Sequence, residues 1–181
     1  MIPHPWLSHL LLSLLLLPAG VLVGWGLYVR RRAAGVPVAI AVRFTVAEVA
    51  MVVGTAPWVW MILTPLPAPR ELHPIPLLDI WGVLQVGFRF AVVQIVGNLL
   101  VFAAFSVFAP MRWRIGPVRV TLIAGAASFV LETLQYALEL GRVSATDDVL
   151  LNALGAGLIA LLLRHQVERL WSAQSEPTSV P

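Results

Sequence analysis

Long apolar runs separated by short polar stretches dominate the chain. Five of these runs approach or exceed the length of about 20 residues that a transmembrane helix needs. They cover residues 9–29, 44–64, 90–109, 117–140 and 148–163. The pattern therefore predicts an all-α, multi-pass transmembrane bundle with about five spans.

The connection between the second and third runs differs from the other loops. It is the longest of them, and its first half has prolines at positions 65, 67, 69, 74 and 76, which favour extended backbone. Its second half, residues 77–88, is apolar but too short to cross a bilayer. We expect this stretch to form a short interfacial or re-entrant helix.

The composition agrees with a membrane protein of one domain. Of the 181 residues, 59% are hydrophobic and 12% are charged, against roughly 45–50% and 25% in soluble domains. This balance leaves too little polar surface for a water-soluble enzyme. The absence of cysteine excludes disulfides, thiolate metal sites and cysteine nucleophiles. We expect residues 1–171 to form the membrane domain and the polar residues 172–181 to form a disordered cytoplasmic tail.

The basic residues are all arginines, and they lie in short clusters between the apolar runs. This arrangement is typical of topology signals, so we expect no nucleic acid partner. Arg30, Arg31 and Arg32 follow the first run, whereas a signal peptide has its basic residues before the apolar stretch. We therefore expect an uncleaved first helix, with the N-terminus outside and the C-terminus in the cytoplasm of a bacterial inner membrane.

Polar residues inside the predicted spans repeat at helical spacing, so each set shares one helix face. If the N-terminus lies outside, the three sets converge in the outer half of the membrane. The sets are Gln94 and Asn98 in the third span, Ser128, Glu132, Gln135 and Glu139 in the fourth, and Asp148 and Asn152 in the fifth.

These residues allow a structural and a functional interpretation. Amides in membrane helices often hydrogen-bond across helix interfaces, and Asp147 or Asp148 can cap the fifth helix. A carboxylate as deep as Glu132 must instead become protonated or find a partner, for which Arg142 and Arg89 are the candidates. Together with Glu132, the two aspartates could act in acid–base chemistry or hold a cation. Glu132 and Asp148 are the candidate catalytic residues.

The order and spacing of several short motifs resemble those of the VanZ-like family over about residues 77–163. The matching positions are Asn98 with Phe102, Glu132-x-x-Gln135, Gly141-Arg142, Asp147-Asp148-Val149 and Asn152-x-x-Gly155. Where the family pattern has Pro and Gly after the Asn–Phe pair, this chain has Ala103, Ala104 and Phe105. The sequence therefore has no helix breaker at that point.

The resemblance implies a multi-pass bacterial membrane protein with a role in the cell envelope. The family's namesake is associated with resistance to the lipoglycopeptide teicoplanin, and the resemblance implies no particular reaction. Our leading hypothesis is a protein, not an enzyme, whose outer-leaflet pocket binds an amphiphilic envelope molecule or a lipoglycopeptide. The expected ligand-binding residues are Gln94, Asn98, Glu132, Gln135, Arg142, Asp147, Asp148 and Asn152.

Two other hypotheses remain open at this point. In one, the chain is an intramembrane hydrolase or transferase that acts on a lipid-linked envelope precursor. Glu132 would be its acid–base residue, and Asp147 or Asp148 would be a metal ligand or an orienting group. In the other, the polar stripes only lock the helices of the bundle together. For the leading hypothesis we expect membrane lipids as partners, and neither a cofactor nor a metal ion.

The topology can be tested with reporter fusions. With the N-terminus outside, nine of the twelve arginines fall in segments assigned to the cytoplasm, as the positive-inside rule requires. A reporter fused after Trp171 should therefore give a cytoplasmic signal. A periplasmic signal from the same fusion would contradict the topology and the placement of the polar residues in the outer leaflet.

Overall fold

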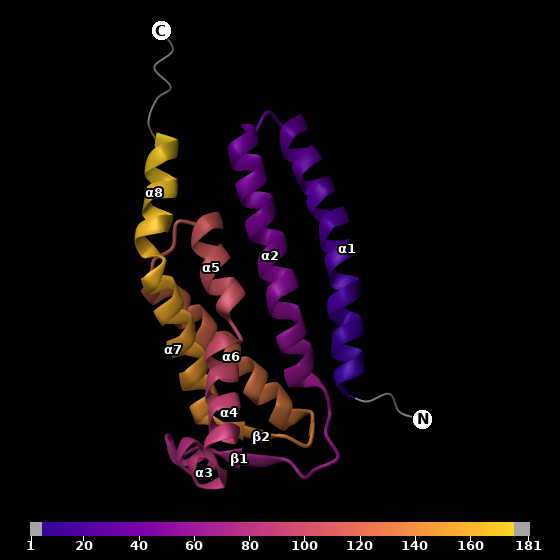
Figure 1. Cartoon of the computed structure of the whole chain (residues 1–181), viewed down its shortest axis with the longest axis vertical. Helices are drawn as coiled ribbons and strands as arrows, with labels where there is room; N and C mark the ends of the chain where they lie inside the picture. Colours follow the sequence, from indigo (N-terminus) through magenta and orange to yellow (C-terminus); the bar gives the residue numbers. More distant parts are fainter. Residues whose placement is uncertain (1–4, 176–181) are drawn as a thin grey trace.

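The computed structural model describes residues 5–175, with side chains for residues 14–173. It is almost entirely helical (Figure 1). In chain order the elements are α1 (Pro5–Ala33), α2 (Val38–Leu63), β1 (Glu71–His73), α3 (Leu78–Val86), α4 (Phe88–Leu100), α5 (Ala103–Arg112), α6 (Pro117–Ala137), β2 (Val143–Ala145), α7 (Thr146–Leu162) and α8 (Arg164–Ser175).

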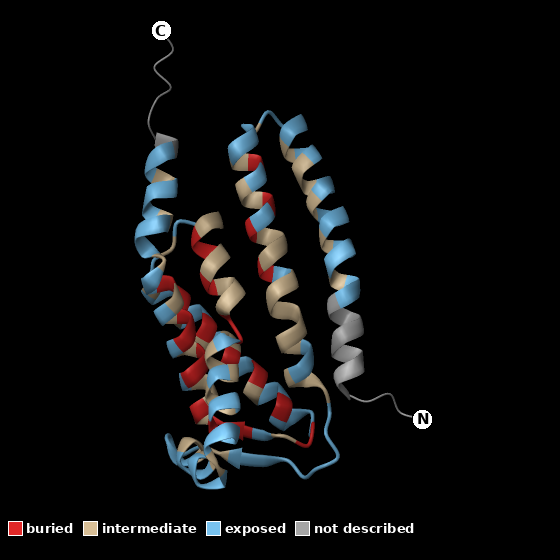
Figure 2. Cartoon of the chain, viewed as in Figure 1, coloured by how far each residue is buried: buried red, intermediate tan, exposed pale blue. Residues whose placement is uncertain are grey.

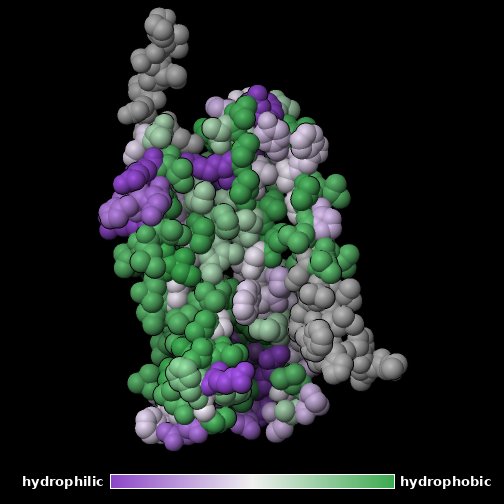
Figure 3. Space-filling view, in the orientation of Figure 1, coloured by the Kyte–Doolittle hydropathy of each residue, from purple (hydrophilic) through white to green (hydrophobic). Residues whose placement is uncertain are grey.

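The described helices confirm the prediction of an all-α, multi-pass transmembrane bundle. Four stretches are long and apolar enough to cross a membrane: α1 from Leu14, α2, α4 continued by α5, and α6. A fifth exists if α7 and α8, which meet at a bend of 50°, form one span. Hydrophobic atoms cover most of the middle of the molecule, and hydrophilic atoms gather toward its two ends (Figure 3). The chain is therefore a multi-pass helical membrane protein.

The two ends of the bundle have different structures. One end, here called the β end, is made of residues 64–87 and 138–147, which include α3 and the parallel pair of β1 with β2. The opposite end, here called the arginine end, carries the α1–α2 connection and the clustered side chains Arg30, Arg31, Arg32, Arg112 and Arg114.

The short helix expected in residues 77–88 is present as α3. The sequence pattern did not predict the pairing of β1 with β2, which brings two three-residue segments together from distant parts of the chain. It also did not predict α8, which extends to Ser175 and so enters the segment expected to be disordered from residue 172. Residues 176–181 of that predicted tail lie outside the described residues.

The third span is interrupted at residues 101–102, where its sequence has neither proline nor glycine. α4 ends at Leu100 and α5 begins at Ala103. Phe102 has φ −101° and ψ 19°, outside the usual α-helical range. Val101 and Phe102 are buried in the apolar core that also contains Val120, Ala124 and Ala156. Packing of these two side chains against α6 and α7 therefore accompanies the break that the sequence did not signal.

The core lies among α5, α6 and α7, where most of the buried positions gather, whereas α1 is largely exposed (Figure 2). α7 crosses α4 closely at Gly155, where an added Cβ would lie only 2.6 Å from the Cα of Leu99. Only glycine permits this approach, as is common where membrane helices pack. This crossing brings the polar faces of α4 and α7 together.

Candidate functional site

A polar cavity of about 500 Å³ lies inside the β end of the bundle. Its walls come from α2, α4, α6 and α7, and from the two segments 66–68 and 141–143. The structure brings seven of the eight expected ligand-binding residues to this cavity, and only Asp147 does not line it. The seven are Gln94, Asn98, Glu132, Gln135, Arg142, Asp148 and Asn152.

Glu132 and Gln135 reach the cavity from the polar face of α6. One carboxylate oxygen of Glu132 accepts a hydrogen bond from the backbone N–H of Ala145 at 3.1 Å. The backbone carbonyl of Glu132 accepts a second bond, from the hydroxyl of Ser144, at 3.0 Å. Gln135 donates its amide N–H to the carbonyl of Ile62 at the end of α2, at 2.8 Å. The two residues thus connect α6 to β2 and to α2.

The polar faces of α4 and α7 meet on the opposite wall. Asn98 on α4 donates a hydrogen bond to the carboxylate of Asp148 on α7. One helical turn further along α7, Asn152 donates its amide N–H to the hydroxyl of Ser128 on α6 at 2.8 Å. These contacts confirm that the three stripes converge, since each stripe contributes a side chain that bonds to another helix.

Arg142 has a role that the sequence did not predict. Its Nε donates to the carbonyl of Thr64 at 2.9 Å, and one of its terminal nitrogens donates to the carbonyl of Met61 at 2.7 Å. The guanidinium therefore satisfies carbonyls at the C-terminal end of α2, where a helix favours positive charge. Within the described side chains neither Arg142 nor Arg89, the two candidate partners, makes an ion pair with Glu132.

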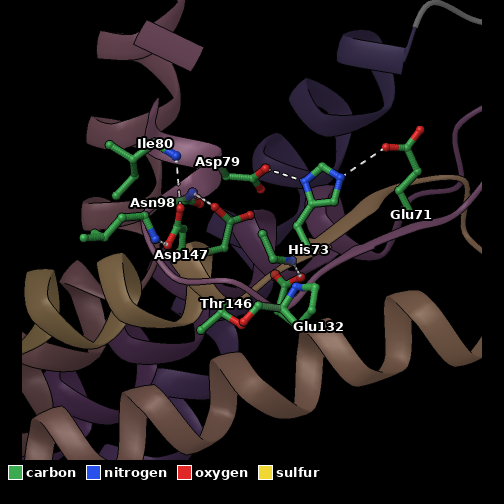
Figure 4. A network of polar contacts seen from close by, with 12 residues as sticks. Glu71, His73, Asp79, Ile80, Asn98, Glu132, Thr146 and Asp147 are labelled. Atoms are coloured by element: carbon green, nitrogen blue, oxygen red, sulfur yellow. Dashed lines mark hydrogen bonds and ion pairs between the residues drawn. The ribbon is translucent and has the colours of Figure 1, made fainter. Parts of the chain in front are cut away.

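Asp147 also differs from the sequence-based expectation. Its side chain is 1% exposed, and its two carboxylate oxygens accept the backbone N–H groups of Leu77 at 2.5 Å and Ile80 at 3.0 Å. These groups lie at the N-terminus of α3 (Figure 4). Asp147 therefore caps α3 rather than its own helix. Both of its carboxylate oxygens are engaged by α3, outside the cavity.

The sequence stripes missed one wall of the cavity. Trp58, Met61 and Ile62 of α2 line it with apolar surface, and an apolar helix without a polar stripe carries no signal of such a role. α2 packs on α1, α5 and α6, whereas α4 packs on α3 and α7. Both α2 and α4 thus contribute to the cavity wall, although they pack mainly on different helices.

The loop segments close the cavity at the β end. Gly141 has φ +64°, and a Cβ there would lie 2.5 Å from the carbonyl oxygen of Ala68, so no other residue fits without a shift. Arg70 forms an ion pair with the exposed Glu139 at 3.0 Å. Glu139 is thus exposed and has its partner outside the cavity, near the end of the fourth span.

His73 anchors a second polar cluster beside the cavity (Figure 4). One ring nitrogen contacts the carboxylate of Asp79 on α3, and the other lies 3.3 Å from the carboxylate of Glu71. The hydrogen bond with Asp79, aided by the negative charges of Asp79 and Glu71, raises the pKa of His73 above its ordinary value. The sequence singled out neither Asp79 nor this pairing, because residues 71–79 form no periodic pattern.

The geometry also bears on metal binding. In the part of the chain that the structure describes, no three His, Cys, Asp or Glu side chains are placed so that they could hold one ion. Asp147, which the enzyme hypothesis offered with Asp148 as a metal ligand or orienting group, has both oxygens engaged by α3. The remaining arrangement is a cavity with two carboxylates, four amides and one guanidinium, inside a bundle whose outer surface is apolar.

This combination defines a class: a polytopic helical membrane protein with a polar cavity near one end of its spans. A model of the VanZ/LLP1 family matches residues 51–168. The chain therefore belongs to the VanZ/LLP1 family. The match begins within α2, earlier than the resemblance at residues 77–163 indicated, and so includes the apolar wall of the cavity. No curated protein and no solved structure matches the chain.

The capping role of Asp147 can be separated from the cavity by two matched substitutions. In Asp147→Asn, an NH₂ group replaces one of the two acceptors, so a buried backbone N–H of α3 loses its partner. Such a loss costs about 1 to 3 kcal/mol. We expect D147N to unfold at a clearly lower temperature in detergent than the wild type. D148N keeps an acceptor for Asn98 and should unfold close to the wild type; equal destabilisation of both would contradict the assignment.

The His73 cluster predicts a dependence of stability on pH. Because the pKa of His73 is raised in the folded protein, its stabilising effect is complete below the ordinary pKa of about 6.5. The effect is lost as the pH rises through the higher, folded-state pKa. We expect H73Q to be less stable than the wild type at pH 5.5, with a difference that shrinks toward pH 9. Thermal unfolding across this range checks it, and a difference that stays constant would contradict it.

Proposed function

We propose that this protein binds the head group of an amphiphilic envelope molecule in its polar cavity, at the outer leaflet of a bacterial inner membrane. The observation that carries the proposal is the cavity itself. Seven polar side chains from three spans and one loop surround about 500 Å³ inside a bundle with an apolar surface. Ligand pockets typically have this size, with apolar walls and a few convergent polar groups.

An apolar groove next to the cavity supports an amphiphile rather than a soluble ligand. It has a volume of about 310 Å³ and is lined by residues of α2, α5 and α6, among them Thr55, Phe102 and Ala124. Thr55 lies one turn along α2 from Trp58 in the cavity wall, and Ala124 lies two turns along α6 from Glu132. An acyl chain in this groove would extend from a head group in the cavity toward the arginine end.

Membership of the VanZ/LLP1 family connects this proposal to lipoglycopeptides. A lipoglycopeptide has a polar body and an acyl chain, which fits a polar cavity beside an apolar groove. We propose that such a compound is one ligand and that the protein contributes to resistance of the teicoplanin type. A bacterial host that expresses the chain should then tolerate teicoplanin better, with no change toward a glycopeptide without an acyl chain.

An intramembrane hydrolase or transferase is the second candidate. The observation that favours it is the presence of Glu132 and Asp148 in one cavity, with no ion pair for either among the described side chains. General acid–base catalysis needs such groups within reach of one substrate. Release of phosphate or of a head group from a lipid-linked precursor by the purified protein would favour this candidate over binding alone.

The role of Glu132 can be tested with Glu132→Gln. A glutamine keeps an oxygen for the backbone N–H of Ala145 but removes the charge from the cavity. We therefore expect E132Q to accumulate in the membrane like the wild type while it loses teicoplanin tolerance and lowers the affinity for teicoplanin about tenfold, or about 1.4 kcal/mol.

Glu139→Gln is the matched control for this experiment. Glu139 lies in the same polar stripe, but it is exposed and pairs with Arg70 outside the cavity. E139Q should keep both tolerance and affinity. Full tolerance and affinity in E132Q would show that the charge of Glu132 is irrelevant and would remove the acid–base candidate as well.

A further inference from the structure

The cavity contains a buried hydrogen-bond acceptor that has no partner. The amide nitrogen of Gln135 faces the carbonyl of Ile62 at 2.8 Å, so its Oε1 must point the other way. The side chain is only 5% exposed and lines the cavity, and Oε1 has no hydrogen bond within the described chain. A buried acceptor without a partner costs about 1 to 3 kcal/mol. A ligand with an N–H or O–H donor would recover this free energy.

Asn152 presents a second acceptor of the same kind. Its side chain is 2% exposed, its nitrogen bonds to the hydroxyl of Ser128, and its Oδ1 has no partner among the described atoms. It lines the same cavity as Gln135, from α7 rather than α6. Two residues that line this cavity, on two helices, therefore each have a buried amide oxygen without a partner in the described chain.

The charged groups around the cavity also favour a ligand that carries hydrogen-bond donors. Glu132 and Asp148 both line it, so carboxylate oxygens stand beside the amide oxygens. Among the described residues, the one cation in the cavity wall is Arg142, whose guanidinium already donates to two carbonyls at the C-terminal end of α2. The space is thus rich in hydrogen-bond acceptors.

Three kinds of ligand can be compared against this lining. An anionic head group would meet two carboxylates and two amide oxygens, which repel it. A bare metal ion would leave most of a cavity of about 500 Å³ unfilled. A primary ammonium carries a positive charge and three N–H donors, which match the carboxylates and the amide oxygens at once.

We infer that the polar cavity selects an amphiphile with a primary ammonium head group, which Glu132 and Asp148 attract and to which Gln135 and Asn152 offer their free oxygens. This inference rests on the proposed function, because it names the chemistry of the ligand that the cavity holds. The same chemistry occurs in a zwitterionic aminophospholipid and in an amphiphile whose only head group is an amine.

The experiment measures affinity for four twelve-carbon amphiphiles. The purified full chain in a neutral detergent is titrated with dodecylamine, dodecyltrimethylammonium, dodecyl phosphate and dodecanol, and the intrinsic fluorescence of Trp58 in the cavity wall reports binding. W58F, titrated alongside, identifies the signal that comes from the cavity. Dodecylamine should bind about tenfold tighter than the quaternary amine, or about 1.4 kcal/mol, because the latter has no N–H donor. Dodecyl phosphate should bind most weakly.

Substitutions assign the preference to the cavity. Q135L should reduce the advantage of dodecylamine over dodecyltrimethylammonium, since it removes the free acceptor and leaves the charges. E132Q should reduce the advantage of both cations over dodecanol. E139Q, outside the cavity, should leave all four affinities unchanged. If Q135L fails to fold, Q135M serves in its place, because it has a similar volume and has no amide oxygen.

The source of the ammonium is distinguished in lipid nanodiscs. Protein in phosphatidylethanolamine discs and in phosphatidylglycerol discs is titrated with dodecylamine. If phosphatidylethanolamine itself occupies the cavity, dodecylamine binds more weakly in those discs, by competition. Equal affinity in both discs indicates an amphiphile whose head group is an amine without a phosphate.

Two outcomes overturn the inference in different ways. Binding of all four amphiphiles with similar affinity, or a preference for dodecyl phosphate, overturns the ammonium assignment while the amphiphile cavity stands. Absence of binding by every amphiphile overturns the proposed function and the inference together. Stabilisation by Ca²⁺ alone, lost in E132Q, would identify a metal site and would also overturn the assignment.

Discussion

Arg142 satisfies the carbonyls that end α2, and most of the β end depends on this interaction. A helix leaves its last carbonyls without partners, and at membrane depth such groups are costly. The side chain of Arg142 bonds to the carbonyls of Met61 and Thr64, while its backbone carbonyl accepts the N–H of Glu71, the first residue of β1. One residue thereby holds the end of α2 and the connection to β1 in place against the segment that follows α6.

Asp147 performs the complementary task at the start of α3. It provides two oxygens for backbone N–H groups at the N-terminus of that helix, where negative charge is favoured. Arg142 and Asp147 lie on either side of β2, so the short segment 142–147 organises two helices that are distant in sequence. The pairing of β1 with β2 completes this arrangement, and the cavity lies directly beneath it.

The arginine end is held by a different kind of contact. Glu48 on α2 accepts hydrogen bonds from Arg31 on α1, at 2.6 Å, and from Arg112 on α5. Arg43 stacks between Phe44 and Trp171, which joins α8 to α2. The arginine end is thus held by ion pairs and cation–π contacts between helices, whereas the β end is held by side chains that bond to the ends of helices.

The sequence by itself determined the helical class, the approximate spans and the convergence of the polar stripes. Apolar runs of spanning length have few alternatives in a bilayer, and i, i+4 spacing places residues such as Gln94 and Asn98 on one face regardless of the fold. The short helix between the second and third spans was predictable for the same reason, because its apolar stretch was too short to cross.

The tertiary structure alone decided which partner each polar group takes. From the sequence alone, Arg142 and Asp147 could each bind a ligand, cap a helix or pair with one another. They cap helices because the tertiary structure brings the ends of α2 and α3 next to them. The apolar wall from α2, the pairing of His73 with Asp79 and the break at Phe102 likewise depend on contacts between segments far apart in the chain. Local periodicity contains no information about such contacts, because it describes one element at a time.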